Sequence, residues 1–298
     1  MLSILIPTYN YNVYPLVTEL KSQADALGIS YEILVQDDAS HFFLRENTEI
    51  NLLQHCSYTL NHENLGRGNN IDLLNNRAQF EYVLILEADA FPEKKTYLQN
   101  LITTINTDTS ILFGGVTYPN QKPEKEKLLR WKYGNERESI SLSERLKNPY
   151  HFVFTWNLLL KKEILSKHHF PYNVKEYGYE DVVFIKQLKE NNILVQHIEN
   201  RLVHFNSETS LTFIEKTEKA VTTFHKLILD KKLELSDTKI GKAYSIITLW
   251  QLDIVIRFLF KRLSKQMVAN LTSSNPSLIV LDLYKLGYFC LLNQKQHV

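Results

Sequence analysis

Short apolar runs alternate with amphipathic segments over residues 1–115. The runs predict buried strands at residues 3–7, 31–36, 57–60, 82–86 and 110–113. Between the first two, Leu16, Leu20, Ala24 and Leu27 recur at helical spacing, and Gly28 follows where a helix would end. Alternation of strands and helices favours right-handed βαβ units. The pattern therefore predicts an α/β fold, with a Rossmann-like, mainly parallel sheet flanked by helices.

The pattern changes twice further along the chain. Residues 118–150 are polar and basic with little periodicity, which predicts a loop-rich excursion. Strands are expected at 156–160, 194–198 and 202–204, and a helix should begin near Glu180. After Ser210 the spacing becomes helical, over residues 213–232, 240–265 and 277–292. We expect one domain over 1–210, with halves 1–115 and 116–210, and a C-terminal helical extension over 211–298.

Composition narrows the function classes. The formal net charge of +1 argues against a dedicated nucleic-acid binder. Two cysteines, Cys56 and Cys290, cannot build a disulfide framework, so a reducing, cytoplasmic compartment is expected. The opening MLSILIPTYN predicts a strand rather than a signal peptide, and no apolar run is long enough to predict a spanning helix.

Polar side chains follow three of the predicted strands, and ligands of open α/β sheets bind beyond the carboxyl ends of strands. These side chains are Thr8, Tyr9 and Asn10, then Asp37 and Asp38, then Glu87 and Asp89. A turn with solvated side chains is the alternative interpretation of each group taken alone. In extended backbone, residues i and i+2 point to one side, so Glu87 and Asp89 would converge. Converging carboxylates repel unless a cation or a proton lies between them, which favours a divalent cation.

The segment Asn64-Leu65-Gly66-Arg67-Gly68-Asn69-Asn70 precedes a predicted helix. Glycines allow close backbone approach to a ligand, and a helix N-terminus favours anions. A plain loop is the alternative. The residue at 71 is isoleucine, so a dinucleotide fingerprint is incomplete, and the chain has no GxxxxGK motif. Glu180 and Asp181 precede another helical run, where they act either as caps or as functional acids.

In this order, the motifs resemble those of the inverting family 2 glycosyltransferases, which have the GT-A fold. The resemblance covers roughly residues 1–225, and rests on SILIPTYN, VQDDAS, NLGRGNN, LEADAFP, TWNLLLKKEIL, YGYEDVVF and HIENRLVH. Two departures stand out. Glu87 replaces the usual aspartate of the metal motif, which makes an indirect metal contact the expectation. Thr155-Trp156 replaces a small, glycine-rich pair, which implies a restricted acceptor pocket.

The resemblance implies a role for each matching residue. The half 1–115 would bind the nucleotide sugar, and the half 116–210 would hold the acceptor and the catalytic groups. Asp181 would be the general base, with Glu180 orienting the acceptor beside Trp156 and Asn157. Asp89 and His204 would ligate a divalent metal, with Glu87 beside them, and an imidazole ligand favours Mn²⁺ over Mg²⁺. The donor-binding residues would be Pro7, Thr8, Asn10, Asp37, Asp38, Asn64, Arg67, Asn70, Glu87 and Ala88.

The expected reaction is transfer of a sugar from a nucleoside diphosphate, with a UDP-sugar as the first choice, to a hydroxyl of a glycan or lipid-linked glycan. One base and a metal-stabilised leaving group suffice for a single displacement with inversion. One alternative is a sugar-1-phosphate nucleotidyltransferase, which would show a Gly-x-Gly-x-Arg loop where this chain has PTYNYN. The other is a non-catalytic scaffold that binds sugar nucleotides.

An apolar stripe marks the predicted helix 240–265. It consists of Ile240, Ala243, Ile247, Trp250, Ile254 and Phe258, and Arg257, Lys261, Arg262 and Lys265 cluster at its far end. Such a helix either lies on an anionic membrane, here the inner face of the cytoplasmic membrane, or packs on the catalytic domain or a second subunit of a homo-oligomer.

Overall fold

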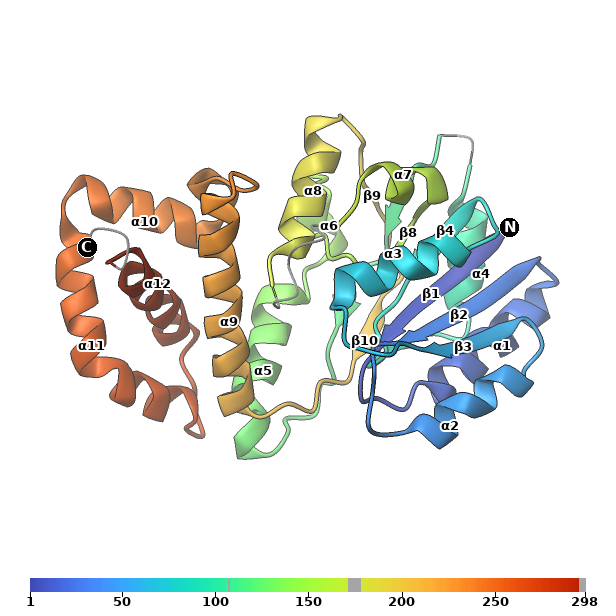
Figure 1. The fold of residues 1–298 in the computed structure, drawn as a ribbon, viewed down its shortest axis with the longest axis horizontal. Coiled ribbons are helices and arrows are strands. Elements are labelled where there is room, and N and C mark those ends of the chain that lie inside the picture. The colour runs from blue at the N-terminus through green and yellow to red at the C-terminus, as the bar shows by residue number, and fades with distance from the viewer. Residues whose placement is uncertain (107, 171–177, 295–298) are drawn as a thin grey trace. The chain divides into compact units, whose positions relative to one another are not determined.

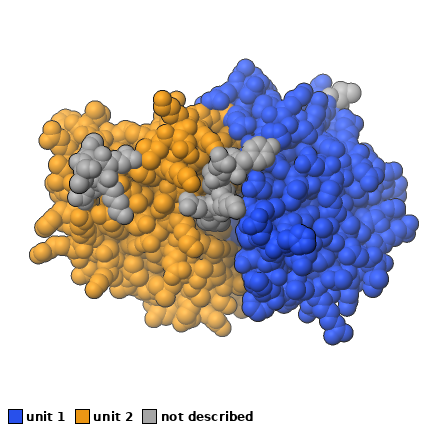
Figure 2. All heavy atoms as spheres, in the orientation of Figure 1, with its two compact units in different colours: residues 1–119, 138–175, 187–205 blue, residues 120–137, 176–186, 206–298 orange. Residues whose placement is uncertain are grey.

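The computed structural model describes residues 1–106, 108–170 and 178–294. The chain divides into two compact units, each built from three stretches of sequence (Figure 2). Unit 1 comprises residues 1–119, 138–175 and 187–205. Unit 2 comprises residues 120–137, 176–186 and 206–298.

Unit 1 is organised around a seven-stranded sheet with the order β3-β2-β1-β4-β8-β6-β9 (Figure 1). Its strands are β1 (Leu2–Thr8), β2 (Tyr31–Asp37), β3 (Cys56–Leu60), β4 (Tyr82–Ile85), β6 (Ile111–Phe113), β8 (Leu158–Lys161) and β9 (Gln196–His197). β3, β2, β1 and β4 are parallel neighbours, whereas β8 is antiparallel to both β4 and β6. The predicted mainly parallel α/β sheet is confirmed.

Helices cover both faces of this sheet, as right-handed crossovers require. α3 (Arg67–Arg77) packs on β1 and β2 and against α7 (Lys162–Lys167), while α1 (Tyr14–Leu27) packs against α4 (Tyr97–Thr104). α1 ends at Gly28, whose φ of 61° is left-handed and thus suits glycine, as predicted. A short helix, α2 (Leu44–Thr48), precedes β3, and α6 (Leu142–Arg145) precedes β8. The buried residues of β1 and β4 form the centre of the core.

A second, three-stranded sheet has the order β5-β10-β7. It comprises β5 (Ala90–Pro92), β7 (Val116–Thr117) and β10 (Leu202–His204). β10 is antiparallel to β5 and parallel to β7. The strand at 202–204 was predicted, but its two partners are too short to leave a pattern in the sequence.

Unit 2 is helical. It contains α5 (Leu128–Tyr133), the start of α8 (Glu180–Glu190), α9 (Ser210–Leu229), α10 (Lys239–Leu249), α11 (Leu252–Leu271) and α12 (Leu278–Gln294). Its core joins Leu129 of α5 to Phe213 of α9, Phe260 of α11 and Leu281 of α12. The predicted C-terminal helical region is confirmed.

Two predictions about the helical segments were wrong in detail. Residues 118–150 are not simply loop, because Leu128 and Leu129 are buried and fold into α5. The single helix expected over 240–265 is two helices, α10 and α11, that meet at a bend of 116°. Among the described residues, no single helix is long and apolar enough to cross a bilayer, and only this bent pair passes that test jointly.

Candidate functional site

The three-stranded sheet brings three polar side chains into one row. Asp89 lies just before β5, in which Ala90 pairs with His204 of β10. The backbone N–H of Phe205 donates to the Asp89 carbonyl at 2.8 Å, which fixes this pairing. Tyr118 directly follows β7, whose Thr117 pairs with Val203. Strand pairing therefore places Asp89 and Tyr118 on opposite sides of His204.

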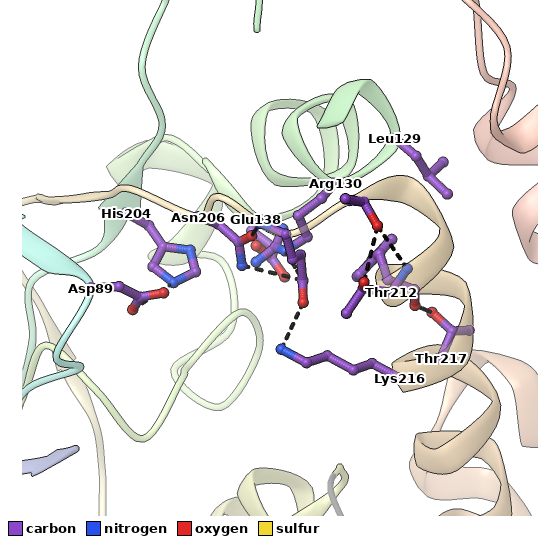
Figure 3. A network of polar contacts seen from close by, with 12 residues as sticks. Asp89, Leu129, Arg130, Glu138, His204, Asn206, Thr212, Lys216 and Thr217 are labelled. Atoms are coloured by element: carbon purple, nitrogen blue, oxygen red, sulfur yellow. Dashed lines mark hydrogen bonds and ion pairs between the residues drawn. The ribbon is translucent and has the colours of Figure 1, made fainter. Parts of the chain in front are cut away.

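His204 is buried and contacts both neighbours through its ring nitrogens. Nε2 lies 3.0 Å from Asp89 Oδ1, and Nδ1 lies 3.2 Å from the Tyr118 hydroxyl (Figure 3 shows the Asp89 pair). Tyr118 donates its own proton to the Glu138 carboxylate. Tyr118 can then accept a hydrogen bond from Nδ1–H, and this tautomer turns the Nε2 lone pair toward Asp89.

Two acceptors facing each other at 3.0 Å repel unless a proton or a cation lies between them. A carboxylate oxygen and an imidazole nitrogen whose other ring nitrogen is hydrogen-bonded form a recurrent donor set for divalent metals. Asp89 and His204 therefore fit as two ligands of a divalent cation, a kind of ion that commonly completes its coordination with phosphate and water oxygens.

Glu87 contacts Arg67. Its carboxylate accepts from Arg67 Nε at 2.7 Å, and the other guanidinium nitrogens of Arg67 donate to the hydroxyl and carbonyl oxygens of Thr155, at 2.9 and 3.0 Å. In the part of the chain that the structure describes, no three His, Cys, Asp or Glu side chains cluster to hold a metal. Glu87 therefore does not join Asp89 and His204 there, and it holds Arg67 in place.

The carboxyl end of β1 carries a buried hydroxyl. Thr8 is 3% exposed, and its Oγ1 has no hydrogen-bond partner among the described residues. A buried hydroxyl of this kind usually forms a hydrogen bond with a ligand or an ordered water molecule. Tyr11 follows in the same loop, and burial, followed by the nearby negative charge of Asp89, raises its pKa. Thus the loop after β1 lies within electrostatic range of Asp89.

Asp38 organises the loop before α3. Its carboxylate is nearly buried and accepts from the backbone N–H groups of Leu65 and Gly66, at 2.8 and 2.9 Å, and from the Asn61 amide at 2.9 Å. Gly66 has a φ of 84°, a conformation that side chains disfavour, so glycine is needed here. Asn64 donates to the Asp38 carbonyl at 3.2 Å. Asp38 thereby sets the position from which Arg67 begins α3.

Several other predicted donor residues have their side chains engaged inside unit 1. Asp37 is fully buried and accepts from Ser40 N at 2.8 Å and from the Tyr58 hydroxyl at 2.7 Å. Burial, followed by this hydrogen bond, raises the pKa of Tyr58. Asn70 donates to the Gln36 carbonyl at 2.8 Å. These contacts connect the ends of β2 and α3 and engage the side chains of Asp37 and Asn70 within the protein.

Hydrogen bonds also connect the loop after β1 to the loop after β2. The backbone N–H of Asn10 donates to Ser40 Oγ at 2.6 Å, and its side-chain oxygen accepts from His41 N at 2.8 Å. Pro7 is buried within β1, and Ala88 is half-buried between Glu87 and Asp89. The predicted donor residues therefore gather at one edge of the sheet.

Trp156 and Asn157 precede β8 and differ in their surroundings. The Trp156 ring is 7% exposed and lies 5.1 Å from the His204 ring, centroid to centroid. Asn157 is fully buried, accepts from the Tyr97 hydroxyl at 2.6 Å, and donates to the carbonyls of Gly115 and Asn200, at 2.5 and 2.9 Å. The acceptor role predicted for Asn157 finds no support in these contacts, which indicate a structural role.

Glu180 and Asp181 belong to unit 2 and form the first turn of α8, where the sequence predicted a helix start. Two residues with positive φ precede them, Gly178 at 108° and Tyr179 at 66°. A Cβ on Gly178 would lie 2.5 Å from the Cβ of Ala220, and the Tyr179 ring stacks on Phe224 at 4.8 Å. A tight turn fixed on α9 thus presents the acidic pair. Tyr177, which begins the matching motif, lies outside the described residues.

Figure 3 also shows a polar cluster of unit 2 that the sequence did not indicate. Glu208 pairs with Lys216 at 2.6 Å and with Arg130 at 3.5 Å, and Asn206 donates to it at 3.2 Å. The Arg130 guanidinium lies over the Phe213 ring, 5.3 Å from its centroid. The cluster connects α5 to the start of α9.

The sequence did not indicate Tyr118, Tyr11 or Thr155 as site residues. Tyr118 lies 86 positions from His204, and Thr155 lies 88 positions from Arg67, so these contacts exist only in the folded chain. Tyr11 could have been suspected, because it lies in the polar segment directly after β1.

Comparison with known proteins concerns the family and the fold. Residues 3–168 match the sequence model of glycosyl transferase family 2. The search of curated protein sequences gave no match. Among solved structures, the mannosyltransferase PcManGT from Pyrobaculum calidifontis has 17% identity and a TM-score of 0.56, over 99% of this chain and 86% of that one.

TarS 1–349 from S. aureus has 15% identity and a TM-score of 0.50, over 99% of this chain and 92% of that one. Other alignments span 64% of a TarS 1–349 chain and 39% of a longer TarS chain. At these identities the structural likeness concerns the fold. The sequence match covers more than half of the residues, so this chain belongs to glycosyl transferase family 2.

Proposed function

We propose that this protein transfers a sugar from a nucleoside diphosphate to a hydroxyl acceptor, with inversion at the anomeric carbon. The observation that carries the proposal is the pairing of Asp89 and His204 at 3.0 Å, just beyond β4. The neighbouring strand β1 ends in Thr8, whose buried hydroxyl suits a polar ligand. A nucleoside diphosphate offers both the phosphates for a metal and the hydroxyls for such a group.

The solved relatives support the choice of donor class. The PcManGT structure contains GDP-Man and Mn²⁺, and a TarS structure contains UDP-GlcNAc. Guanine and uracil nucleotides thus occur on one fold, so the base has to be found by experiment. A UDP-sugar is the first donor that we propose to test.

The metal would be held by Asp89 and His204, and we propose Mn²⁺ because an imidazole ligand suits it better than it suits Mg²⁺. When bound, the ion neutralises negative charge on the diphosphate leaving group. Arg67 contributes a fixed positive charge at the start of α3, held by Glu87 and Thr155. Asp38 fixes the loop before α3 by accepting hydrogen bonds from the backbone N–H groups of Leu65 and Gly66.

Asp181 would remove the proton of the acceptor hydroxyl as the new glycosidic bond forms. Glu180 would orient that hydroxyl, and Trp156 would border the acceptor pocket. A retaining double displacement needs a second carboxylate close to the anomeric carbon, as nucleophile. The family resemblance assigns one base, so a single displacement is proposed.

The acceptor that we propose is a glycan or a lipid-linked glycan, in the cytoplasm. This rests on the resemblance and on the low cysteine count, with two cysteines in 298 residues.

A panel of nucleotide sugars, screened by thermal shift with and without Mn²⁺, would identify the donor. Donor turnover with the selected sugar, followed by NMR of the anomeric proton of the product, would then test transfer and inversion. Binding without metal-dependent turnover, in the presence of a range of glycan acceptors, would favour the scaffold alternative. A product with retained configuration would overturn the single displacement.

A further inference from the structure

The junction of α10 and α11 is a sharp corner with apolar residues at its tip. α10 ends at Leu249, α11 begins at Leu252, and the two axes bend by 116°. Gln251 takes a left-handed φ of 55° at the turn. Leu249 and Trp250, at the tip, are 81% and 75% exposed, which is unusual for large apolar side chains.

The exposed apolar surface continues from the tip along both helices. On α10 it includes Ile246, and on the outward face of α11 it includes Leu252, Ile254, Val255, Phe258 and Leu259. The opposite face of α11 faces the core of unit 2 through Phe260 and Leu271. Packing within unit 2 therefore accounts for one face of α11 only. Contiguous apolar surface of this kind marks an interaction site.

Basic residues follow directly on α11. Lys261, Arg262 and Lys265 are exposed, and the Arg262 guanidinium lies 5.7 Å from the centroid of the Phe258 ring. The only acidic residue of α11 is Asp253, which is half-buried. Apolar side chains at a tip and cations beside them match the two layers of an anionic membrane surface, acyl chains and headgroups.

We infer that the corner formed by α10 and α11 docks on an anionic membrane. Leu249, Trp250 and their apolar neighbours enter the interface, where a tryptophan ring is favoured, and Lys261, Arg262 and Lys265 contact lipid phosphates. α11 carries five charged residues and cannot span the bilayer on its own, so the corner lies in the interface.

Charge favours a membrane over a second copy of this chain as the occupant. A two-fold contact brings the same patch of both subunits together. Through α11 it would bring two copies of the cluster Lys261, Arg262 and Lys265 into one interface, where the only acidic residue of α11, Asp253, is half-buried. An anionic bilayer instead presents negative charge to these cations.

Vesicle flotation tests this inference with the full chain. The probes are phosphatidylcholine vesicles, with and without phosphatidylglycerol, at low and high salt. We expect flotation with the anionic vesicles, and weaker flotation at high salt because salt screens surface charge. The triple variant Lys261→Gln, Arg262→Gln, Lys265→Gln should lower the partition coefficient by roughly 10²-fold, at about 1 kcal/mol per basic residue.

A second variant, Leu249→Ser with Trp250→Ser, should lower the partition coefficient by at least about 10-fold, because each substitution removes a large apolar side chain from the membrane interface. Leu52→Ser is the matched control, because Leu52 is 84% exposed in unit 1. It should float like the wild type. Circular dichroism would verify that every variant is folded.

No flotation of wild type at low salt, or equal flotation of the corner variants, would overturn the inference. Concentration-dependent dimers that the corner variants abolish would instead assign the surface to self-association. Donor turnover without vesicles should be the same for wild type and both corner variants. Because that assay does not involve lipid, failure of the docking inference and failure of the proposed transferase activity can be told apart.

Discussion

His204 Nε2 lies 3.0 Å from Asp89 Oδ1, although the two residues are 115 positions apart in the sequence. The antiparallel pairing of β5 with β10 produces this contact, and Tyr118 orients the imidazole from the other side. Two segments that lie far apart in the sequence thus form the pair that we propose as metal ligands.

We expect Asp89→Ala and His204→Ala each to weaken Mn²⁺-dependent binding of the nucleotide sugar by about 10-fold or more. A loss of about 10-fold is typical even for a residue that only hydrogen-bonds to a metal ligand. Binding of the nucleoside without phosphates should change little, because it does not require the metal. Calorimetric titrations with both ligands would measure this. Full activity in EDTA, or with Mg²⁺ equal to Mn²⁺, would contradict the proposed metal site.

Tyr118→Phe tests the orientation of the imidazole. It removes the hydroxyl 3.2 Å from His204 Nδ1 and keeps the ring in place. We expect the Mn²⁺ affinity to fall by about 10-fold, which is the lower end of the range for loss of a hydrogen bond to a metal ligand. Phe154→Leu, at a ring that stacks on Trp156 and not on His204, is the control. Unchanged Mn²⁺ affinity of Tyr118→Phe would show that the hydroxyl does not position the ligand.

Glu87→Gln distinguishes two roles of that carboxylate. If Glu87 holds Arg67, as the 2.7 Å contact indicates, the variant should weaken donor binding and leave Mn²⁺ affinity unchanged. A pair of this kind, partly exposed, contributes about 0.2–1 kcal/mol. The double variant with Arg67→Ala should then be no worse than Arg67→Ala alone. A marked loss of Mn²⁺ affinity would instead make Glu87 a metal ligand.

Asp181→Asn keeps the shape of the proposed base and removes its basicity. Turnover should fall by roughly 10²–10⁴-fold, typical for loss of a general base, while donor affinity stays near the wild-type value. Glu180→Gln should act mainly through the KM of the acceptor. Steady-state kinetics on both variants would measure these effects, and near-normal turnover of Asp181→Asn would end the assignment.

Asp72 provides a prediction about stability. Its two carboxylate oxygens are buried and accept no hydrogen bond within the described ranges. Burial raises the pKa of Asp72, and His169, whose Nδ1 lies 3.6 Å from it, offsets part of this effect. Because the folded pKa lies above the unfolded one, the unfolded state loses the Asp72 proton first, and stability falls as the pH rises from the unfolded pKa to the folded pKa.

Asp72→Asn should therefore stabilise the protein at pH 7, by about 1 kcal/mol, at the lower end of the cost of an unpartnered buried polar group. The gain in stability should shrink below about pH 4, near the ordinary pKa of aspartate, because Asp72 of the wild type is then protonated and as neutral as the asparagine of the variant. Thermal unfolding across this pH range would measure it, with the exposed Asp230→Asn as control. A gain that does not depend on pH would rule out ionisation as the cause.

The sequence predicted the elements whose signals are local. The apolar runs of β1, β2 and β4, and the stop of α1 at Gly28, agree with the structure because burial and backbone conformation leave their mark on neighbouring residues. The site was predictable where polar residues follow such strands. The paired residues at 89 and 204 are one example, although here the family resemblance was needed to connect them.

What the sequence did not predict depends on long-range contacts. The segment with Leu128 and Leu129 looks polar on average, yet both side chains are buried and α5 packs on α9 and α12. The stripe from Ile240 to Phe258 fits one straight helix equally well, and only the turn at Gln251 divides it. The role of Asn157 was also beyond reach, because its partners Tyr97, Gly115 and Asn200 come from three separate segments.

The interleaving of the two units has a consequence for any attempt to shorten this protein. Glu180 and Asp181 lie in the second stretch of unit 2, whose core is completed by α9, α11 and α12 from the third stretch. A ribosome that has released residues 1–205 has supplied every stretch of unit 1, but only two of the three stretches of unit 2. The turn that precedes the acidic pair packs on Ala220 and Phe224 of α9, so it can take its final conformation only after α9 has emerged. A chain truncated after residue 205 would keep every stretch of unit 1, but it would lose α9, on which the turn before the acidic pair packs, and the corner that we propose to dock on a membrane.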